Sequence, residues 1–143
     1  MHSEYVSHSY IETEQIAEKF ALNLKGGEIL AFTGKLGMGK TCFVRGLARG
    51  LGFKGEVSSP TFALINEYIG GRLNLYHFDM YRVNGWEDLY STGFFDYTEL
   101  NGVVAVEWSE NISGALPDST VFIKIERIDD NTRKITFTGG KEK

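Results

Sequence analysis

The sequence of 143 residues lacks a long apolar run, and it contains only one cysteine and two prolines. The single cysteine, Cys42, cannot form an intramolecular disulfide, which is typical of proteins in a reducing compartment. No apolar stretch approaches the ~20 residues that a membrane-spanning helix requires. The N-terminal stretch MHSEYVSHSY has neither the basic nor the apolar region of a secretory signal. These absences predict a cytoplasmic protein without a membrane segment.

The sequence also lacks an excess of positive charge. It has 15 Lys and Arg against 19 Asp and Glu, a net charge of −4 and an isoelectric point of about 5.4. A protein that binds nucleic acid unaided usually presents a basic stripe, and none is found here. We therefore expect any nucleic acid to be held by a partner protein. The length predicts a single domain over residues 1–143.

Apolar residues recur with two different spacings along the chain. Helical spacing is found in residues 13–24 and 43–51, which predicts two amphipathic helices. Continuous apolar runs, typical of strands buried on both faces, are EILAFT at residues 28–33 and VVAVEW at 103–108. Strands that alternate with helices in this way predict an α/β sheet with a parallel centre.

Turn signals separate further strand-like segments. Residues 61–69 and 72–79 flank Gly70-Gly71, which predicts a β-hairpin. A second hairpin is predicted for residues 120–138, and a short helix for 87–90. Hairpins are antiparallel, so we expect a P-loop NTPase-like mixed sheet with a parallel centre, antiparallel edge strands and flanking helices.

The stretch GKLGMGKT at residues 34–41 matches the phosphate-loop pattern G-x-x-x-x-G-K-[ST]. Successive backbone N–H groups of such a loop form a nest for phosphate oxygens, and the following helix adds its N-terminal dipole. Lys40 is expected to reach the β- and γ-phosphates, and the Thr41 hydroxyl to bind Mg²⁺. The predicted nucleotide-binding residues of the loop are Lys35, Leu36, Gly37, Met38, Gly39, Lys40 and Thr41.

The alternative interpretation of this stretch is a chance match. Average residue usage gives roughly a 1% probability of the pattern in a chain of this length. The stretch also lies between EILAFT and CFVRGLARGL, the strand and the helix that a phosphate loop requires. The sequence context therefore favours a nucleotide site.

A P-loop NTPase needs a further acid near the magnesium, at the end of a neighbouring strand. Glu107 ends the apolar run VVAVE, and Asp79 ends LNLYHFD. If both strands flank the loop strand, both carboxylates point toward the metal. The alternative is that each is a strand-end acid that faces solvent. Because a phosphate loop requires such an acid, both are predicted to be catalytic.

Three further residues have both a functional and a structural interpretation. Thr61, in the stretch SSPTF, could sense the γ-phosphate as ordered switch segments do, or it could belong to an ordinary turn. Trp108 is expected on the opposite face of its strand from Glu107, where core packing is favoured. His77 has no second His or Cys nearby, so a packing or hydrogen-bonding role is favoured over metal ligation.

The sequence favours ATP over GTP, because it contains no N-K-x-D motif for guanine. Small kinases share the phosphate loop but close an Arg-rich lid over the phosphates. The segment 109–118 is short and contains neither Arg nor Lys, which argues against a kinase. The predicted cofactors are therefore ATP or ADP with Mg²⁺.

Taken together, the motifs resemble those of the bacterial TsaE (YjeE) ATPases. The resemblance runs from about residue 13 to the C-terminal hairpin. Two departures from the family pattern are Lys35, where an acid is commoner, and Ser109, where proline is common. The matching motifs are GKLGMGKT (34–41), VRGLARGLG (44–52), SSPTF (58–62), HFDMYR (77–82), VEW (106–108) and LPD (116–118).

The resemblance implies roles for individual residues. Lys40 and the loop amides would bind the phosphates, and Thr41 and Glu107 would bind Mg²⁺. Asp79 would contact the metal's water shell or the γ-phosphate, and Thr61 would be the switch-like residue. Trp108 would be functionally sensitive. The base pocket would involve Tyr10 and the hairpin residues Asn131 and Arg133.

The resemblance also implies a biological role. TsaE proteins support formation of threonylcarbamoyladenosine (t6A) at A37 of ANN-decoding tRNAs by driving turnover of a TsaD–TsaB complex. The implied activity is Mg²⁺-dependent hydrolysis of ATP to ADP and phosphate, slow without the partner, and tRNA would be met only through partners. Arg82 is the best internal candidate for an arginine finger. The alternatives are a small-molecule kinase and a non-catalytic module that senses ATP and ADP.

Overall fold

The computed structural model describes residues 2–33, 39–55 and 65–139. They form one seven-stranded sheet with the order β1-β7-β6-β2-β5-β4-β3. The strands are β1 (His2–Ser7), β2 (Ile29–Thr33), β3 (Ile65–Tyr68), β4 (Leu75–Asp79), β5 (Val103–Glu107), β6 (Val121–Arg127) and β7 (Arg133–Gly139). The helices are α1 (Tyr10–Ala21), α2 (Lys40–Gly50), α3 (Trp86–Ser91) and α4 (Phe94–Thr98), with a 3₁₀ segment η1 (Ser109–Ala115).

The centre of the sheet is parallel and its edges are antiparallel. β2 pairs in parallel with β5 and β6, and β4 pairs in parallel with β5. β3 pairs antiparallel with β4, and β7 pairs antiparallel with β6 and β1. The first four residues of β2 and of β5 are buried, as their continuous apolar sequences require. The predicted mixed sheet with a parallel centre is confirmed.

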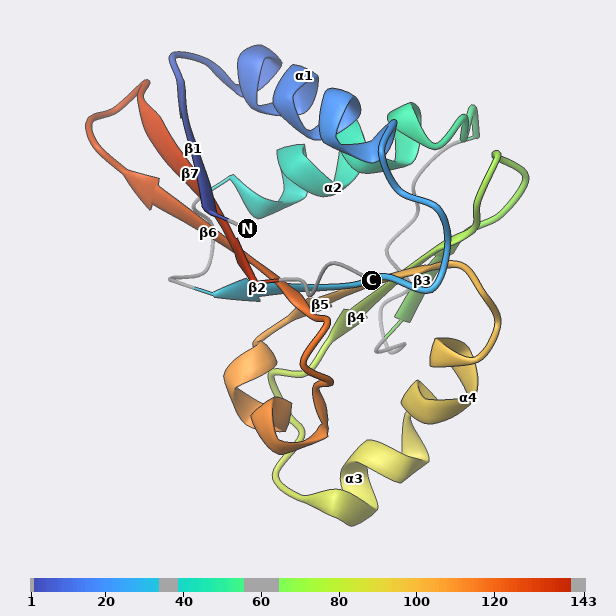
Figure 1. Ribbon diagram of the computed structural model, residues 1–143. Coiled ribbons are helices and arrows are strands. Elements are labelled where there is room, and N and C mark those ends of the chain that lie inside the picture. The colour runs from blue at the N-terminus through green and yellow to red at the C-terminus, as the bar shows by residue number, and fades with distance from the viewer. Residues whose placement is uncertain (1, 34–38, 56–64, 140–143) are drawn as a thin grey trace.

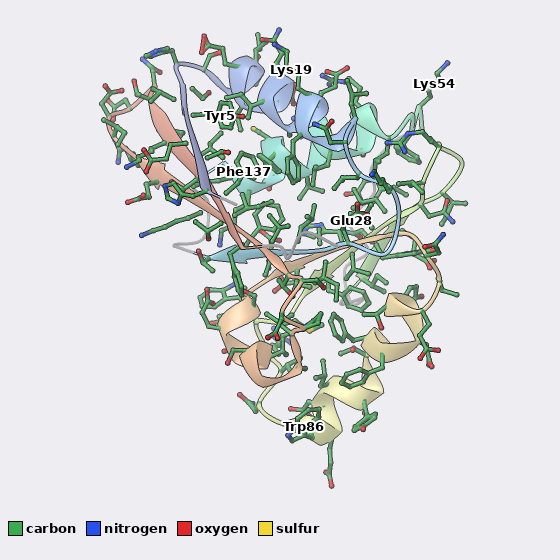
Figure 2. All side chains as sticks on the ribbon, in the orientation of Figure 1. Tyr5, Lys19, Glu28, Lys54, Trp86 and Phe137 are labelled. Carbon is green, nitrogen blue, oxygen red and sulfur yellow. The ribbon has the colours of Figure 1, made fainter. Side chains whose placement is uncertain are left out.

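Helices cover both faces of the sheet (Figure 1). α1 and α2 lie on one face, and α3, α4 and η1 lie on the other. Two apolar clusters lie between the sheet and these helices. The cluster beneath α1 and α2 includes Phe32, Phe43 and Phe137, and the cluster beneath α3 and α4 includes Phe78 and Phe94. Figure 2 shows Phe137 between the sheet and the α1–α2 layer and Trp86 at the far end of the opposite layer.

α1 begins at Tyr10, three residues before the helix that apolar spacing predicts. The Ser9 hydroxyl oxygen accepts a hydrogen bond from the Glu12 amide at 3.1 Å, and a Glu12 carboxylate oxygen accepts one from the His8 amide at 2.8 Å. Ser9 therefore caps the helix by satisfying one of its free N–H groups, and Glu12 binds the residue just before the cap. The apolar stripe missed this start because the first turn, YIE, is largely exposed.

Sequence patterns also missed β1, α4 and η1. β1 is an edge strand with mostly exposed residues, so its sequence HSEYVS has no apolar periodicity. Its order comes from pairing with β7, in which His2 faces Thr138 and Ser7 faces Arg133. None of the helices in the described parts of the chain is long and apolar enough to cross a membrane.

Glycines allow α1 and α2 to pack closely. A Cβ added to Gly46 would overlap the backbone carbonyl oxygen of Glu14, and one added to Gly50 would overlap that of Glu18. Both overlaps are with backbone, which cannot move aside as a flexible side chain can. The contact between the two helices therefore depends on the absence of side chains at these positions.

We expect the substitution Gly46→Ala to destabilise the protein, because overpacking a core usually costs about 1–3 kcal/mol. The gain in helix propensity from alanine, about 1 kcal/mol, offsets only part of this cost. Gly114→Ala is the control, because nothing lies within 4 Å of a Cβ there. Urea denaturation of the two variants measures the difference. Equal midpoints for both variants would contradict the packing argument.

Candidate nucleotide-binding site

The junction between β2 and α2 has the strand–loop–helix order that a phosphate loop requires. β2 ends at Thr33 and α2 begins at Lys40. Gly39, which caps the helix, has a φ angle of 100°, a left-handed conformation that favours glycine. The predicted loop residues Lys35, Leu36, Gly37 and Met38 lie outside the described residues, as does Thr61.

The N-terminus of α2 is an electropositive end. The first turn of the helix contains no acidic residue that would neutralise its dipole. Lys40, the first helical residue, is 3% exposed, whereas Thr41 beside it is exposed. A helix N-terminus with a lysine and an accessible hydroxyl group suits the binding of phosphate oxygens.

Asp79 and Glu107 lie next to each other. They are the last residues of β4 and β5, and their Cα atoms are partners in the parallel register of the two strands. The Met80 amide donates to the Glu107 carbonyl oxygen at 3.0 Å, so the pairing continues past the strand ends. The Tyr81 amide donates to a carboxylate oxygen of Asp79 at 3.0 Å, which restrains that side chain.

Only one of the two acid-bearing strands is a direct neighbour of the loop strand. β5 pairs with β2, but β4 pairs with β5 and lies one strand further away. The condition that both strands flank β2 is therefore met by β5 and not by β4. Asp79 nevertheless reaches the same place, because parallel strands in register end at one edge of the sheet.

Both carboxylates are on the α1–α2 face of the sheet. Side chains alternate along a strand, and Ala105, two residues before Glu107, belongs to the cluster beneath α1 and α2. Burial raises the pKa of Tyr68, a residue of the same cluster, and the charge of Glu107 raises it further. The charge of Lys40 also acts on Glu107. Lys40 and Glu107 are therefore close enough for their charges to interact.

Glu107 has a histidine partner. The Nε2–H group of His77 donates to a carboxylate oxygen of Glu107 at 2.9 Å, and the side chains are 12% and 14% exposed. Burial alone would raise the pKa of Glu107. The hydrogen bond and charge of His77, with the charge of Lys40, hold the pKa below its ordinary value instead. Glu107 is therefore ionised at neutral pH.

The contact of His77 with Glu107 was not predicted, because the sequence of one strand does not show which residues of the next strand lie beside it. The H-x-D spacing places His77 and Asp79 on one face of β4, which sequence can predict. The register of β4 with β5 pairs His77 with Ala105. This register brings Glu107 within reach of His77, and it cannot be read from either strand alone. The expected hydrogen-bonding role agrees with the observed contact.

Trp108 follows Glu107 and packs on the opposite face, as strand alternation predicts. Its ring packs against Tyr81, with the ring centroids 4.9 Å apart, and it contacts the cluster beneath α3 and α4. Its φ angle of 58° is uncommon for a bulky residue. The next residue, Ser109, donates its hydroxyl proton to the Phe32 carbonyl oxygen at 2.9 Å, which links η1 to the end of β2.

The predicted base-pocket residues lie around the β6–β7 turn. Tyr10 begins α1 and is exposed, and Ser7 just before this helix pairs with Arg133. Arg133 donates to the Asp129 carbonyl oxygen at 2.8 Å, so its guanidinium group holds the turn. Asn131 is exposed at the tip of this turn. Since β6 runs parallel to β2, the turn lies beyond the edge of the sheet at which β2 ends.

The donor set fits magnesium. Mg²⁺ prefers oxygen ligands, keeps several waters and is usually held by one or two carboxylates with substrate phosphates. The ionised Glu107, the exposed Asp79 and the exposed Thr41 hydroxyl supply such oxygens. No group of three or more His, Cys, Asp or Glu suited to a metal is found within residues 2–33, 39–55 and 65–139. In magnesium sites with few protein carboxylates, waters and phosphate oxygens complete the set of ligands.

Comparison with known proteins identifies the family. The family model "Threonylcarbamoyl adenosine biosynthesis protein TsaE" matches residues 7–135. The chain belongs to the TsaE family. The TsaE protein of Treponema pallidum is 40% identical over 131 residues, which cover 92% of this chain and 96% of the relative. That of Bacillus subtilis is 45% identical over 128 residues, 89% of this chain and 79% of the relative.

A solved structure supports the same conclusion for the fold. The crystal structure of Bacillus subtilis YdiB is similar to this TsaE family member with a TM-score of 0.81 and 36% sequence identity. The likeness covers 99% of this chain and 87% of the other. The region that the family model matches includes Lys40, Asp79 and Glu107. The family assignment and the sheet architecture agree.

Proposed function

We propose that this TsaE family member is a P-loop ATPase in threonylcarbamoyladenosine biosynthesis. It hydrolyses ATP to ADP and phosphate with Mg²⁺, and the hydrolysis drives repeated turnover of a TsaD–TsaB complex that modifies A37 of ANN-decoding tRNAs. The membership in the family supports the biosynthetic role. The observation that supports the chemistry best is the placement of Asp79 and Glu107 side by side, on the face of the sheet that α2 covers.

In this proposal the chain's own residues position the triphosphate and stabilise its charge. Lys40 and the N-terminal amides of α2 hold the β- and γ-phosphate oxygens, where negative charge develops as the γ-phosphoryl group transfers to water. Water forms a new bond to the γ-phosphorus, the bond from this phosphorus to the β–γ bridging oxygen breaks, and the water gives up a proton. Asp79 orients this water or the metal's water shell.

Magnesium, when bound, neutralises charge on the β- and γ-phosphates. Thr41 and Glu107 are the residues that would hold it, and the low pKa of Glu107 keeps that carboxylate in its ligating form. The predicted Arg82 is exposed in the loop after β4, three residues beyond Asp79. Because an arginine finger contributes about 10³–10⁵ in rate where it is present, hydrolysis without the partner is expected to be slow.

The test of this proposal is steady-state ATP hydrolysis by the purified protein, measured alone and with TsaD and TsaB added together. Strong stimulation by the two partners is expected. The proposal would be contradicted if the protein bound nucleotide but hydrolysed ATP at the same low rate with and without the partners. That result would favour a module that senses ATP and ADP. Transfer of the γ-phosphate to a small acceptor rather than water would favour a kinase.

A kinase would require an acceptor pocket near the γ-phosphate. Under the kinase alternative, the sequence offers residues 85–100 for such a pocket. In the structure this stretch contains α3 and α4, on the face of the sheet opposite to Glu107. This placement does not favour phosphate transfer to a small molecule. The direct test between the two activities is whether small acceptor molecules raise ATP consumption above the rate of hydrolysis by water alone.

We expect His77 to act as a positioning residue for Glu107. Replacing His77 by alanine removes the hydrogen bond to the carboxylate, and loss of such an outer contact usually costs about 10–100-fold in metal affinity. The expected result is a corresponding increase in the Mg²⁺ concentration that gives half-maximal ATP hydrolysis. The value of kcat at saturating Mg²⁺ is expected to change less.

The control for this prediction is His77→Gln, whose side-chain amide can still donate to Glu107. This variant is expected to recover most of the Mg²⁺ dependence of the wild type. A merely structural role would instead alter thermal stability in both variants and leave the Mg²⁺ dependence unchanged. Identical Mg²⁺ titrations for wild type and His77→Ala would rule out the positioning role.

A further inference from the structure

A cluster of aromatic side chains lies on the surface of the α3–α4 layer. Trp86 and Tyr90 of α3 are 58% and 66% exposed. Their rings pack on Phe95 of α4, with centroid distances of 6.1 Å for Trp86 and 5.1 Å for Tyr90. Contiguous exposed apolar surface is typical of binding sites, and Trp and Tyr are enriched where binding energy concentrates.

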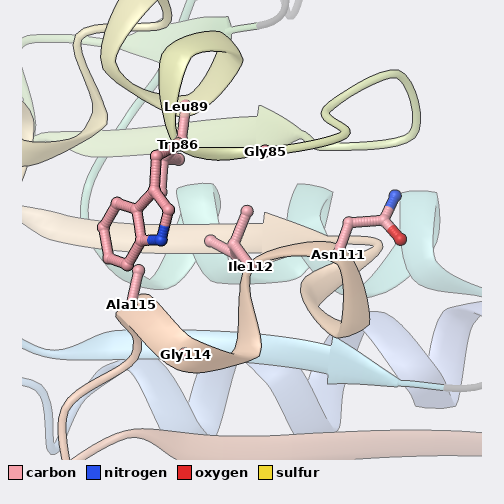
Figure 3. A pocket seen from close by; sticks show the side chains of 7 residues that line it. All are labelled: Gly85, Trp86, Leu89, Asn111, Ile112, Gly114 and Ala115. Carbon is pink, nitrogen blue, oxygen red and sulfur yellow. The ribbon is translucent and has the colours of Figure 1, made fainter.

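A pocket opens beside this cluster. Its volume is about 100 Å³, and Trp86 belongs both to its lining and to the aromatic cluster. Figure 3 shows the Trp86 indole pointing from α3 toward Ile112 and Ala115 of η1. The lining residues are Gly85, Trp86, Leu89, Asn111, Ile112, Gly114 and Ala115. The lining is mostly apolar, with one side-chain amide, so it suits an apolar side chain.

The chain around this pocket is strongly acidic. Apart from Glu107, which lies on the opposite face of the sheet, residues 83–123 contain six of the protein's 19 carboxylates and none of its 15 Lys and Arg or 3 His. Two of the acids, Glu87 and Asp88, are in the first turn of α3, directly after Trp86, and Glu110 precedes Asn111 in η1. The nearest cations along the chain are Arg82 and Lys124. Such a surface repels nucleic acid and anionic lipid and attracts the Lys and Arg of a partner protein.

Hydrogen bonds link one residue of the pocket lining to the strand end that carries Asp79. The Asn111 side-chain amide donates to the carbonyl oxygens of Met80 at 2.8 Å and Tyr81 at 3.3 Å. The Tyr81 amide in turn donates to Asp79. A partner seated on Asn111 would therefore contact the segment that restrains one of the two site carboxylates.

We infer that this aromatic–acidic surface (the pocket with Trp86, Tyr90, Glu87, Asp88 and Glu110) docks a partner protein. The partner inserts one apolar side chain beside Trp86 and places Lys or Arg against the carboxylates. This inference rests on the proposed function for the identity of the partner, which is the TsaD–TsaB complex. It adds where on this chain that complex binds and which chemistry it presents.

The test is the affinity of the full-length protein for the purified TsaD–TsaB complex, measured by isothermal titration calorimetry. The double variant Trp86→Ala/Tyr90→Ala is expected to bind at least about 10-fold more weakly, the scale of a truncated hot spot. The charge-reversal variant Glu87→Lys/Glu110→Lys is expected to bind more weakly and to lose part of the salt dependence of binding. The control is Leu22→Ala, an equally exposed apolar residue at the end of α1.

Binding of a fluorescent ADP analogue to each variant is the readout that separates docking from the nucleotide site, and it is expected to be unchanged. Wild-type affinity in both surface variants would overturn the docking inference and leave the proposed function standing. A wild-type protein that does not bind the complex would overturn the proposed function and this inference with it. Self-association of the wild type that the same substitutions abolish, seen by sedimentation velocity, would assign the surface to a second copy instead.

Discussion

Replacing Lys40 by alanine is expected to abolish tight binding of ATP. Lys40 is the first residue of α2, it is almost fully buried, and its charge acts on Glu107. A hydrogen bond to a charged group contributes about 1.5–3 kcal/mol, which corresponds to roughly 10- to 100-fold in Kd. The titration of a fluorescent ATP analogue into wild type and variant measures this loss.

The control for Lys40 is Lys19→Ala, which removes the same charge from the exposed last turn of α1 (Figure 2). Its nucleotide affinity is expected to equal that of the wild type. Thermal melting of both variants checks that they are folded, because a buried residue is replaced in one of them. A folded Lys40→Ala protein that binds ATP as tightly as the wild type would show that the stretch GKLGMGKT is not a phosphate-binding loop.

Replacing Glu107 by glutamine is expected to stop hydrolysis while nucleotide still binds. The substitution preserves the shape of the side chain but removes its negative charge. His77 and Lys40 stabilise this charge against the effect of burial. The loss in kcat is expected to be at least about 100-fold, the scale of a single lost transition-state contact. Because a negative charge near the phosphates is also removed, the affinity for ATP without Mg²⁺ is expected to be unchanged or higher.

Phosphate release under saturating ATP, with the partner complex present, is the measurement for Glu107→Gln. Glu18→Gln is the matched control, because Glu18 makes a surface ion pair with Arg49 at 3.8 Å, and such pairs contribute little. The control is expected to hydrolyse ATP at the wild-type rate. Retention of wild-type hydrolysis by Glu107→Gln would exclude Glu107 from the chemistry and leave Asp79 as the remaining acid of the proposed site.

The parallel centre of the sheet and its two hairpins could be predicted from sequence, because their signals are local. EILAFT and VVAVE are continuous apolar runs that only a doubly covered strand can bury, and Gly70 takes a φ angle of 107° in the first hairpin turn. The helix at 87–90 was predicted nearly to its observed bounds, Trp86–Ser91. Each of these features is specified by one continuous stretch of chain.

The remaining features depend on contacts between distant segments. β1 has an exposed sequence and exists because β7 offers it an edge, and β4 lies outside β5 rather than beside β2. Likewise, the pairing of His77 with Glu107 requires the register between β4 and β5. The sequence predicted a set of residues for the chemistry of the candidate site, which stays a prediction, but it did not predict which side chain holds Glu107 in place.

The placement of Ser109 also needed the structure. Proline is common at this position in the TsaE family pattern, and the sequence alone assigned no role to the serine. The structure shows that its buried hydroxyl group donates to the Phe32 carbonyl oxygen, at the end of β2. A hydrogen bond across 77 residues of chain is invisible to a local pattern, although a buried polar side chain is usually paired.

The most direct test of the central claim, that ATP hydrolysis at this site drives repeated modification, is a count of product in a reconstituted reaction. The amount of t6A formed per TsaD–TsaB complex is measured with wild type, with Glu107→Gln and with Glu18→Gln. The wild type and Glu18→Gln are expected to support many modifications per complex, and Glu107→Gln about one. Repeated modification with Glu107→Gln at the wild-type rate would contradict the account.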